Sequence, residues 1–384
     1  MRRTSPGKLI GSLALLLVAL PCLAAAQGLV DSRGALSALP ESQAVLFINA
    51  RRLIHEALPR TLPPAEYQKL LEGPQQAGFD IRQLDYAAAA IRFADPSKPA
   101  GLPEFVVVVK GTFNADSLLT LARVGLGTQQ EIKTRRETYG SKTIEIIDTS
   151  FLAGGGKKPD GDGGGAPPPS SNPIPFPEIA VMALDSNTLV AGVPAYVRAL
   201  VDAAGGQGRL KASTVALATK DPNALWSLTA EIPPSLADYL KKTGMPSNQE
   251  AEQILSWLRQ VSFAQGMDAV NFTLQAALEL DSPEHASALS GIVRMGLTAA
   301  QAGLNAEAAK KTGKEAEQAR TALGVVKSMV NRTEGNTVVL SASVSQATVA
   351  ALVKKELEAK AAKPSTATKP TPRRRPARRR GTRR

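Results

Sequence analysis

The sequence predicts an α+β fold made of two similar units. Short apolar or alternating segments, which are typical of strands, recur along the chain with segments of helical period between them. Several strand–helix patterns of residues 27–208 also return in the same order in residues 209–359. We therefore expect each unit to hold an antiparallel or mixed sheet with helices packed on one face.

The first unit is predicted to contain seven strands and three helices. Asn114 is a suitable cap for one helix, Pro194 suits the first turn of another, and a helix over 64–72 is closed by Gly73 and Pro74. Gly140 and Ser141 predict a hairpin turn. The predicted strands cover 43–49, 87–93, 105–109, 134–139, 143–147, 179–184 and 188–191.

The second unit restarts with a strand over 224–232. Ala251, Ile254, Leu255 and Leu258 form an amphipathic helical stripe. Ser282 opens a long helix, and an Ala-rich helical stretch over 306–330 is broken near Gly313. The remaining predicted elements are strands over 272–280 and 337–344 and a last helix capped by Ser345.

Paired segments indicate an internal duplication. Residues 187–190 and 197–201 match residues 336–339 and 349–353, and Arg123-Val124-Gly125-Leu126 matches Arg294-Met295-Gly296-Leu297. The alternative is chance, because strand–helix segments rich in Val, Ala and Leu resemble one another easily. The offset between the matches shrinks along the chain, as a long insertion in the first unit would cause. Residues 154–177, rich in Gly and Pro, are predicted to be that insertion, a disordered surface loop.

The first 26 residues have the form of a signal peptide. A basic start with Arg2, Arg3 and Lys8 precedes an apolar stretch over 9–23, and Ala24-Ala25-Ala26 resembles a cleavage site. The sequence thus predicts an exported protein, periplasmic or extracellular, cleaved near Ala26, with no transmembrane span in the mature chain. The alternative is an uncleaved N-terminal membrane anchor.

Positive charge is concentrated at the two ends of the chain. Residues 360–384 hold eleven basic residues and no acidic one, and residues 1–26 hold three. The rest of the chain has 32 basic residues against 34 acidic ones, so the formal net charge of +12 does not describe a basic body.

The C-terminal tail is predicted to be a disordered polycation over 360–384, because its prolines prevent a helix. Such a chain attracts dense anions, and salt weakens the attraction. An envelope polymer or lipid headgroups would be the anionic partner, although a solvated tail without function is the alternative. Base-specific nucleic-acid binding is not expected, because the tail has no aromatic residue. The predicted contact residues are Arg373, Arg374, Arg375, Arg378, Arg379, Arg380, Arg383 and Arg384.

The inventory of chemical groups gives no catalytic, cofactor or metal site. Cys22 is the only cysteine and lies in the signal peptide, and His55 and His285 are the only histidines, each predicted to lie on the surface. No zinc motif, nucleophile elbow or phosphate-binding loop is present. The carboxylate pairs Asp80 with Asp85 and Glu279 with Asp281 fit helix caps and strand ends better than acid–base catalysis.

The organisation of the chain resembles that of uncharacterised exported bacterial proteins built of tandem α+β repeats. The resemblance rests on Leu39-Pro40 before the strand at 44–49 and on the strand–helix pair at 336–353, and it implies no activity. Together these features predict a non-catalytic binding or scaffold protein of the cell envelope whose tail contacts an anionic partner. The alternative is an exported hydrolase that uses carboxylates in a cleft between the two units.

Overall fold

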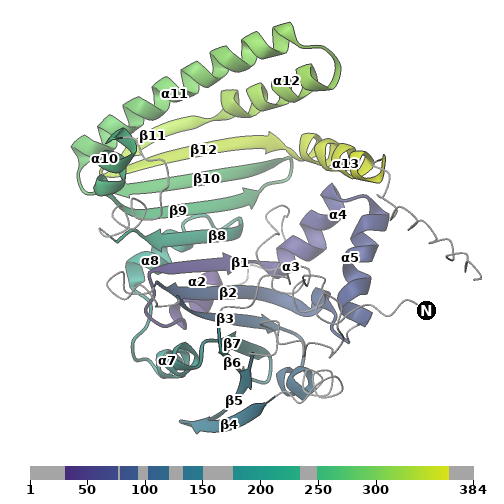
Figure 1. Ribbon diagram of the computed structural model, residues 1–384, viewed down its shortest axis with the longest axis vertical. Helices are drawn as coiled ribbons and strands as arrows, with labels where there is room; N and C mark the ends of the chain where they lie inside the picture. The colour runs from purple at the N-terminus through teal and green to yellow at the C-terminus, as the bar shows by residue number, and fades with distance from the viewer. Residues whose placement is uncertain are drawn as a thin grey trace, which may run out of the picture.

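A single antiparallel sheet of twelve strands organises the molecule and confirms the α+β class (Figure 1). The computed structural model describes residues 31–76, 78–93, 103–120, 133–149, 176–233 and 249–362. In spatial order the strands are β11 (Val330–Glu334), β12 (Thr337–Ser345), β10 (Asn271–Leu280), β9 (Leu258–Met267), β8 (Ala224–Glu231), β1 (Ala44–Ile48), β2 (Leu84–Arg92), β3 (Glu104–Gly111), β7 (Thr188–Gly192), β6 (Glu178–Asp185), β5 (Lys142–Asp148) and β4 (Thr134–Tyr139).

The two predicted halves share this one sheet, because β1 pairs with β8 at its middle. Leu46 lies opposite Leu228 in that pairing. Outward from it, the first half runs β1-β2-β3-β7-β6 and the second runs β8-β9-β10-β12-β11, and the hairpin β4–β5 is an addition to the first half. The two halves therefore have equivalent strand orders, while a common origin by duplication stays a prediction.

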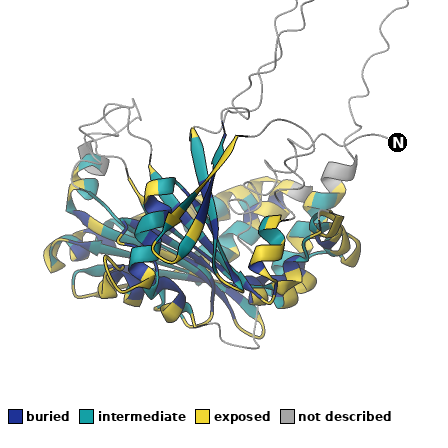
Figure 2. Ribbon diagram, turned by 90° about the horizontal axis from the view of Figure 1, so that it is seen from below, coloured by how far each residue is buried: buried dark blue, intermediate teal, exposed yellow. Residues whose placement is uncertain are grey.

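Helices cover one face of the first half. Buried side chains of α2 (Ser32–Ser37), α7 (Pro194–Ala204) and α8 (Ala212–Ala218) pack against Val45 and Phe47 and against the residues beside them on β2, β3, β6 and β7. Figure 2 shows the buried positions concentrated in the strands and on the inner sides of the helices. This layer is the largest hydrophobic core of the molecule.

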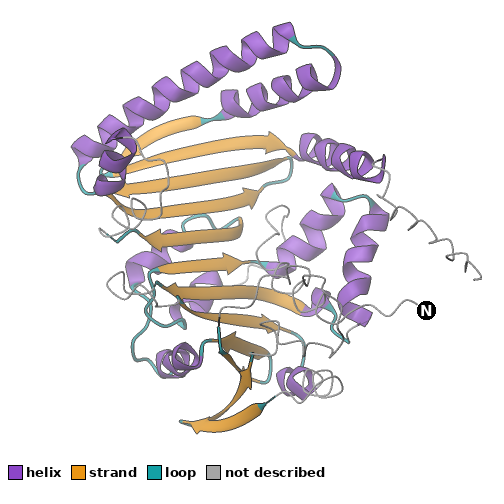
Figure 3. Cartoon of the chain, in the orientation of Figure 1, coloured by secondary structure: helices purple, strands orange, loops and turns teal. Residues whose placement is uncertain are grey.

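Helices near the ends of the strands and a helical hairpin beside the β11–β12 edge complete the fold (Figure 3). α3 (Ala50–Arg52), the π-helix η1 (Leu53–Ala57), α4 (Leu58–Thr61) and α5 (Pro64–Gln76) follow β1, and the 3-10 helix η2 (Ile81–Gln83) precedes β2. In the second half, α10 (Gln249–Trp257) precedes β9. α11 (Pro283–Lys310) and α12 (Gly313–Ser328) form a helical hairpin, and α13 (Gln346–Ala362) follows β12.

Several local predictions are confirmed by hydrogen bonds. Asn114 Oδ1 accepts from the amide of Ser117, Ser282 Oγ accepts from His285, and Ser345 Oγ accepts from Thr348, so each residue caps the helix it precedes. Gly140 has φ +56° in the turn between β4 and β5, a backbone conformation that favours glycine.

Other elements differ from prediction. β9, β11, α2 and α8 were not predicted. The stripe that ends at Leu258 runs one residue too far, since α10 stops at Trp257 and Leu258 begins β9. α5 continues past Gly73 and Pro74 and ends at Gln76. Two residues later, Gly78 has φ +80°. Nothing lies near an added Cβ at position 73, so packing does not require a glycine there.

Candidate functional site

The predicted tail arginines lie outside the described residues. The last described residue is Ala362, at the end of α13, and α13 packs beside α4 and β12. The predicted loop over 154–177 falls almost wholly outside the described residues too. Within the described part of the chain, no helix is long and apolar enough to cross a membrane.

The two histidines have separate structural partners. His55 is exposed on η1, and its Nε2 lies 3.0 Å from the carbonyl oxygen of Arg82. The ring of His285 stacks on Trp257 with centroids 4.1 Å apart, and its Nδ1 lies 2.6 Å from Asp281 Oδ1. In the described ranges, no three His, Cys, Asp or Glu side chains gather in a way that could hold a metal ion.

The carboxylate pairs singled out from the sequence are each engaged elsewhere. Asp80 accepts two hydrogen bonds from Arg82 Nε and one from its Nη2, which holds the pKa of that carboxyl below its usual value. Asp85 lies 3.2 Å from Arg51. The pKa of Asp281 is lowered by its hydrogen bond to His285, while Glu279 accepts a 3.4 Å hydrogen bond from Asn336. These contacts hold the acids in ion pairs and local hydrogen bonds.

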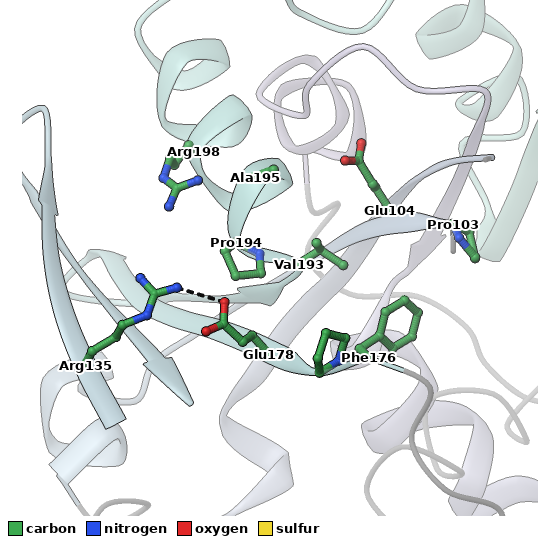
Figure 4. A pocket seen from close by; sticks show the side chains of 10 residues that line it. Pro103, Glu104, Arg135, Phe176, Glu178, Val193, Pro194, Ala195 and Arg198 are labelled. Atoms are coloured by element: carbon green, nitrogen blue, oxygen red, sulfur yellow. Dashed lines mark hydrogen bonds and ion pairs between the residues drawn. The ribbon is translucent and has the colours of Figure 1, made fainter. Parts of the chain in front are cut away.

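A hollow of about 430 Å³ lies beside the first turn of α7 (Figure 4). Pro103, Phe176, Pro177, Val193, Pro194 and Ala195 form its apolar lining, and Glu104, Arg135, Glu178 and Arg198 supply its charges.

The charged groups of this hollow pair with acids or bases of their own. Arg135 Nη2 lies 2.8 Å from Glu178 Oε2. Arg198 makes a two-point contact with Glu137 at 2.6 and 2.7 Å, which lowers the pKa of the Glu137 carboxyl. Glu104 pairs with Arg92. Each of these charged side chains is therefore already paired with an opposite charge of the protein.

A row of apolar side chains crosses nine strands on the face opposite α2, α7 and α8. Neighbouring members are direct partners in the register of the sheet. We call it the central apolar row; its members are Val181, Ala191, Val107, Ala89, Leu46, Leu228, Phe263, Ala276 and Leu340.

In the middle strands of the second half, some apolar side chains are exposed while small polar side chains on the opposite face are buried. Phe263 of the row is 40% exposed, and Leu274, on the same face, is 44% exposed. On the opposite face, Ser227, Thr229 and Ser262 are at most 6% exposed. Sheets ordinarily bury their apolar face and expose their polar one. Phe263 and Leu274 therefore face the surface in the middle of these strands, while Met267, Phe272 and Leu280 near the strand ends are buried.

Helices flank the central apolar row. Along one side, α3, η1, α4 and α13 pack over Ile48, Ala87 and Phe272, the positions at the strand ends nearest these helices. Along the other side, in the second half only, α10 and α11 pack over Leu278 and Val338. Figure 1 shows α10 and α13 at opposite ends of β9, β10 and β12. The row thus lies between two sets of helices in the second half and beside one set in the first half, where Leu46 packs against that set.

Sequence reasoning missed this row because it did not identify β9, which supplies Phe263. The signal was present: Val261, Phe263 and Gln265 alternate with Gln260, Ser262 and Ala264, as a strand with two different faces requires. The apolar character of Leu228 and Leu340 was visible, but their alignment across the sheet depends on pairings that the sequence does not show.

Comparison with known proteins gives only distant structural likenesses. No protein-family model matches the chain, and no curated protein matches its sequence. Crystal forms III, IV and I of TP0453 are similar at 7, 8 and 9% identity, with TM-scores of 0.39, 0.38 and 0.37. They cover 83, 83 and 85% of this chain and 97, 95 and 97% of their own. A likeness at this level supports no inference about fold or function.

Proposed function

We propose that the protein is an exported, non-catalytic binding or scaffold protein of the bacterial cell envelope, and that its arginine tail contacts an anionic partner. The observation that carries the proposal is the separation of charge between tail and body. The tail has eleven basic residues and no acidic one, whereas the segment between signal peptide and tail is close to neutral.

The ion pairs of the described residues support this separation. Arginines on both halves of the sheet contact carboxylates, so their charge is balanced locally. The pairs are Arg51–Asp85, Arg92–Glu104, Arg135–Glu178, Arg198–Glu137 and Arg259–Asp281. Exposed pairs of this kind contribute little to stability, but they leave less charge for a polyanion to bind. The tail is therefore the segment with the strongest attraction for an anionic surface.

The test compares the full chain with a chain that ends at Ala362, both expressed with the native signal. Cells are fractionated, and the envelope pellet is washed with increasing salt. We expect the full chain to leave the pellet at moderate salt and the truncated chain to be released from the start. Equal behaviour of the two chains, or retention of the full chain at every salt concentration, would contradict the role given to the tail.

Two matched tails separate charge from length. In one, all eight arginines from Arg373 to Arg384 become lysine, which keeps the charge; in the other they become serine. The lysine tail should still support salt-sensitive association and the serine tail should not. Mass spectrometry of the purified protein should give Gln27 as its first residue; a start at residue 1 would favour the anchored alternative.

A further inference from the structure

We infer that the central apolar row is the docking surface for a hydrocarbon chain of an anionic membrane lipid. The inference rests on the proposed function in one respect, since it takes the anion that the tail contacts to be the headgroup of that lipid.

The row needs an apolar cover. Its members form one strip across nine strands, and Phe263 is 40% exposed. Leu274, beside the row, is 44% exposed while small polar residues behind the same strands are buried. The other eight members of the row are half-buried. Partly covered apolar surface that continues across nine strands is typical of an interaction site, because its contact with water costs free energy.

The row offers its occupant no polar side chain. No member of the row can donate or accept a hydrogen bond through its side chain. On each of the nine strands, the next residue on this face toward α4 and α13 is also apolar or aromatic. The one exception is Gln265 on β9. The amide oxygen of Gln265 already accepts a 2.8 Å hydrogen bond from Trp226 Nε1. This surface therefore recognises an occupant by burial, without hydrogen bonds.

The width and length of the row suit a single hydrocarbon chain. Helices pack over the sheet on both sides of the row in the second half, which leaves a narrow strip for the occupant. Sheet-on-sheet packing with a second copy requires two open faces about 10 Å apart, so these helices oppose it. Nine strands at roughly 4.8 Å spacing give a strip about 38 Å long. A lipid chain, which spans roughly half of the 30 Å bilayer core, fits within it.

Positive charge follows α13 directly in the sequence. Residues 363–384 carry ten basic residues and begin directly after α13, whose Val349 packs in the helical layer beside the row. Twenty-two residues reach up to about 70 Å when extended, so the tail can meet a headgroup at any point along the strip. A ligand with one anionic end and a hydrocarbon body satisfies both features.

The row is tested with the mature chain and a fluorescent fatty acid as probe. The variant F263D/L274D places two carboxylates on the strip at exposed positions. Its matched control is V270D/M295D, because Val270 and Met295 are 64% and 67% exposed and belong to the β9–β10 turn and to α11. We expect probe affinity to fall at least tenfold in the first variant and to stay within twofold in the control.

A second variant guards against a folding defect. Ala276→Trp adds bulk to the row without charge and should also weaken probe binding, with an unchanged circular dichroism spectrum and melting temperature within a few degrees. Wild-type affinity in both F263D/L274D and Ala276→Trp would overturn the inference. Sedimentation provides a second check. If the wild type is a dimer and F263D/L274D is a monomer, the row joins two copies and the inference is overturned.

The tail is tested separately with vesicles of phosphatidylcholine alone or with phosphatidylglycerol. A chain that ends at Ala362 should lose its preference for phosphatidylglycerol while it keeps wild-type affinity for the fatty acid. If the truncated chain kept that preference, the function proposed for the tail would be wrong. The assignment of the row would then be decided by fatty-acid binding alone. If the full chain preferred phosphatidylglycerol but bound no fatty acid, the row assignment would fail alone.

Discussion

Arg52 Nη1 donates a hydrogen bond to the carbonyl oxygen of Asn223, 2.8 Å away, and so ties α3, which follows β1, to the turn before β8. Nη2 of the same guanidinium donates to the carbonyl oxygen of Met267, at the end of β9, at 3.4 Å. Arg52 is only 2% exposed, and burial lowers its pKa. A side chain of the first half thus satisfies two backbone carbonyls of the second.

Substitution of this arginine should weaken the whole fold. Arg52→Met leaves both carbonyls without their donor, and we expect a loss of about 2–3 kcal/mol in the free energy of unfolding, measured with urea. Arg51→Met is the control, because the Arg51 side chain is 45% exposed and its ion pair with Asp85 is worth less than about 1 kcal/mol. Equal losses in the two variants would contradict the link between the halves.

Glycines of the long helix α11 offer a stabilising change. Gly291 and Gly296 lie inside α11, and an added Cβ at either position meets nothing within 4 Å. Each change to alanine should raise the free energy of unfolding by roughly 0.5–1 kcal/mol, because alanine has the higher helix propensity. Gly192→Ala in β7 should destabilise, since its Cβ would lie 2.3 Å from the carbonyl oxygen of Phe105. Thermal unfolding of the three variants checks both signs.

Two tyrosines should ionise late. Burial raises the pKa of Tyr86 and of Tyr196 to about 12 from the ordinary 10.0, because the buried phenolate loses its hydration. The unfolded chain therefore loses these protons first, and stability should be full below about pH 10 and fall as pH rises toward 12. Tyr196→Phe should remove one late step from the absorbance titration at 295 nm and flatten the fall. A titration with all tyrosines ionised by pH 11 would refute this.

The Asp281–His285 contact predicts an acid dependence. The hydrogen bond from His285 lowers the pKa of Asp281 below 3.8, so its contribution to stability is present above that pH and is lost as pH falls through the lowered value. Asp281→Asn should accordingly be less stable than the wild type at pH 7, and the two should converge in acid. Urea unfolding at pH 7, 5 and 3 measures the gap. Glu284→Gln, an exposed change in the same helical turn, should show a smaller gap at pH 7.

Local patterns were the part of the fold that could be predicted from the sequence. Caps such as Asn114, Ser282 and Ser345 act through hydrogen bonds to residues three positions away, so they can be recognised without tertiary information. The strand at 44–48 was recognised from its apolar run, and the turn at Gly140 from its composition.

The union of the halves could not be predicted in this way. The pairing of Leu46 with Leu228 joins residues far apart in the chain, and neither local pattern specifies the other as partner. The central apolar row depends on eight strand pairings at once, some of them between distant segments and some within hairpins. The tail arginines, predicted from composition as the contact with an anion, lie beyond Ala362 and outside the described residues.

The pairing of β1 with β8 also has a consequence for how the protein is made. The N-terminal half can form β2 beside one edge of β1, but the other edge of Ala44–Ile48 has no partner until residues 224–231 have been synthesised. During that interval an entirely apolar strand edge is open to other chains, which is a known cause of aggregation. The nascent protein should therefore depend on a holding chaperone until its second half emerges.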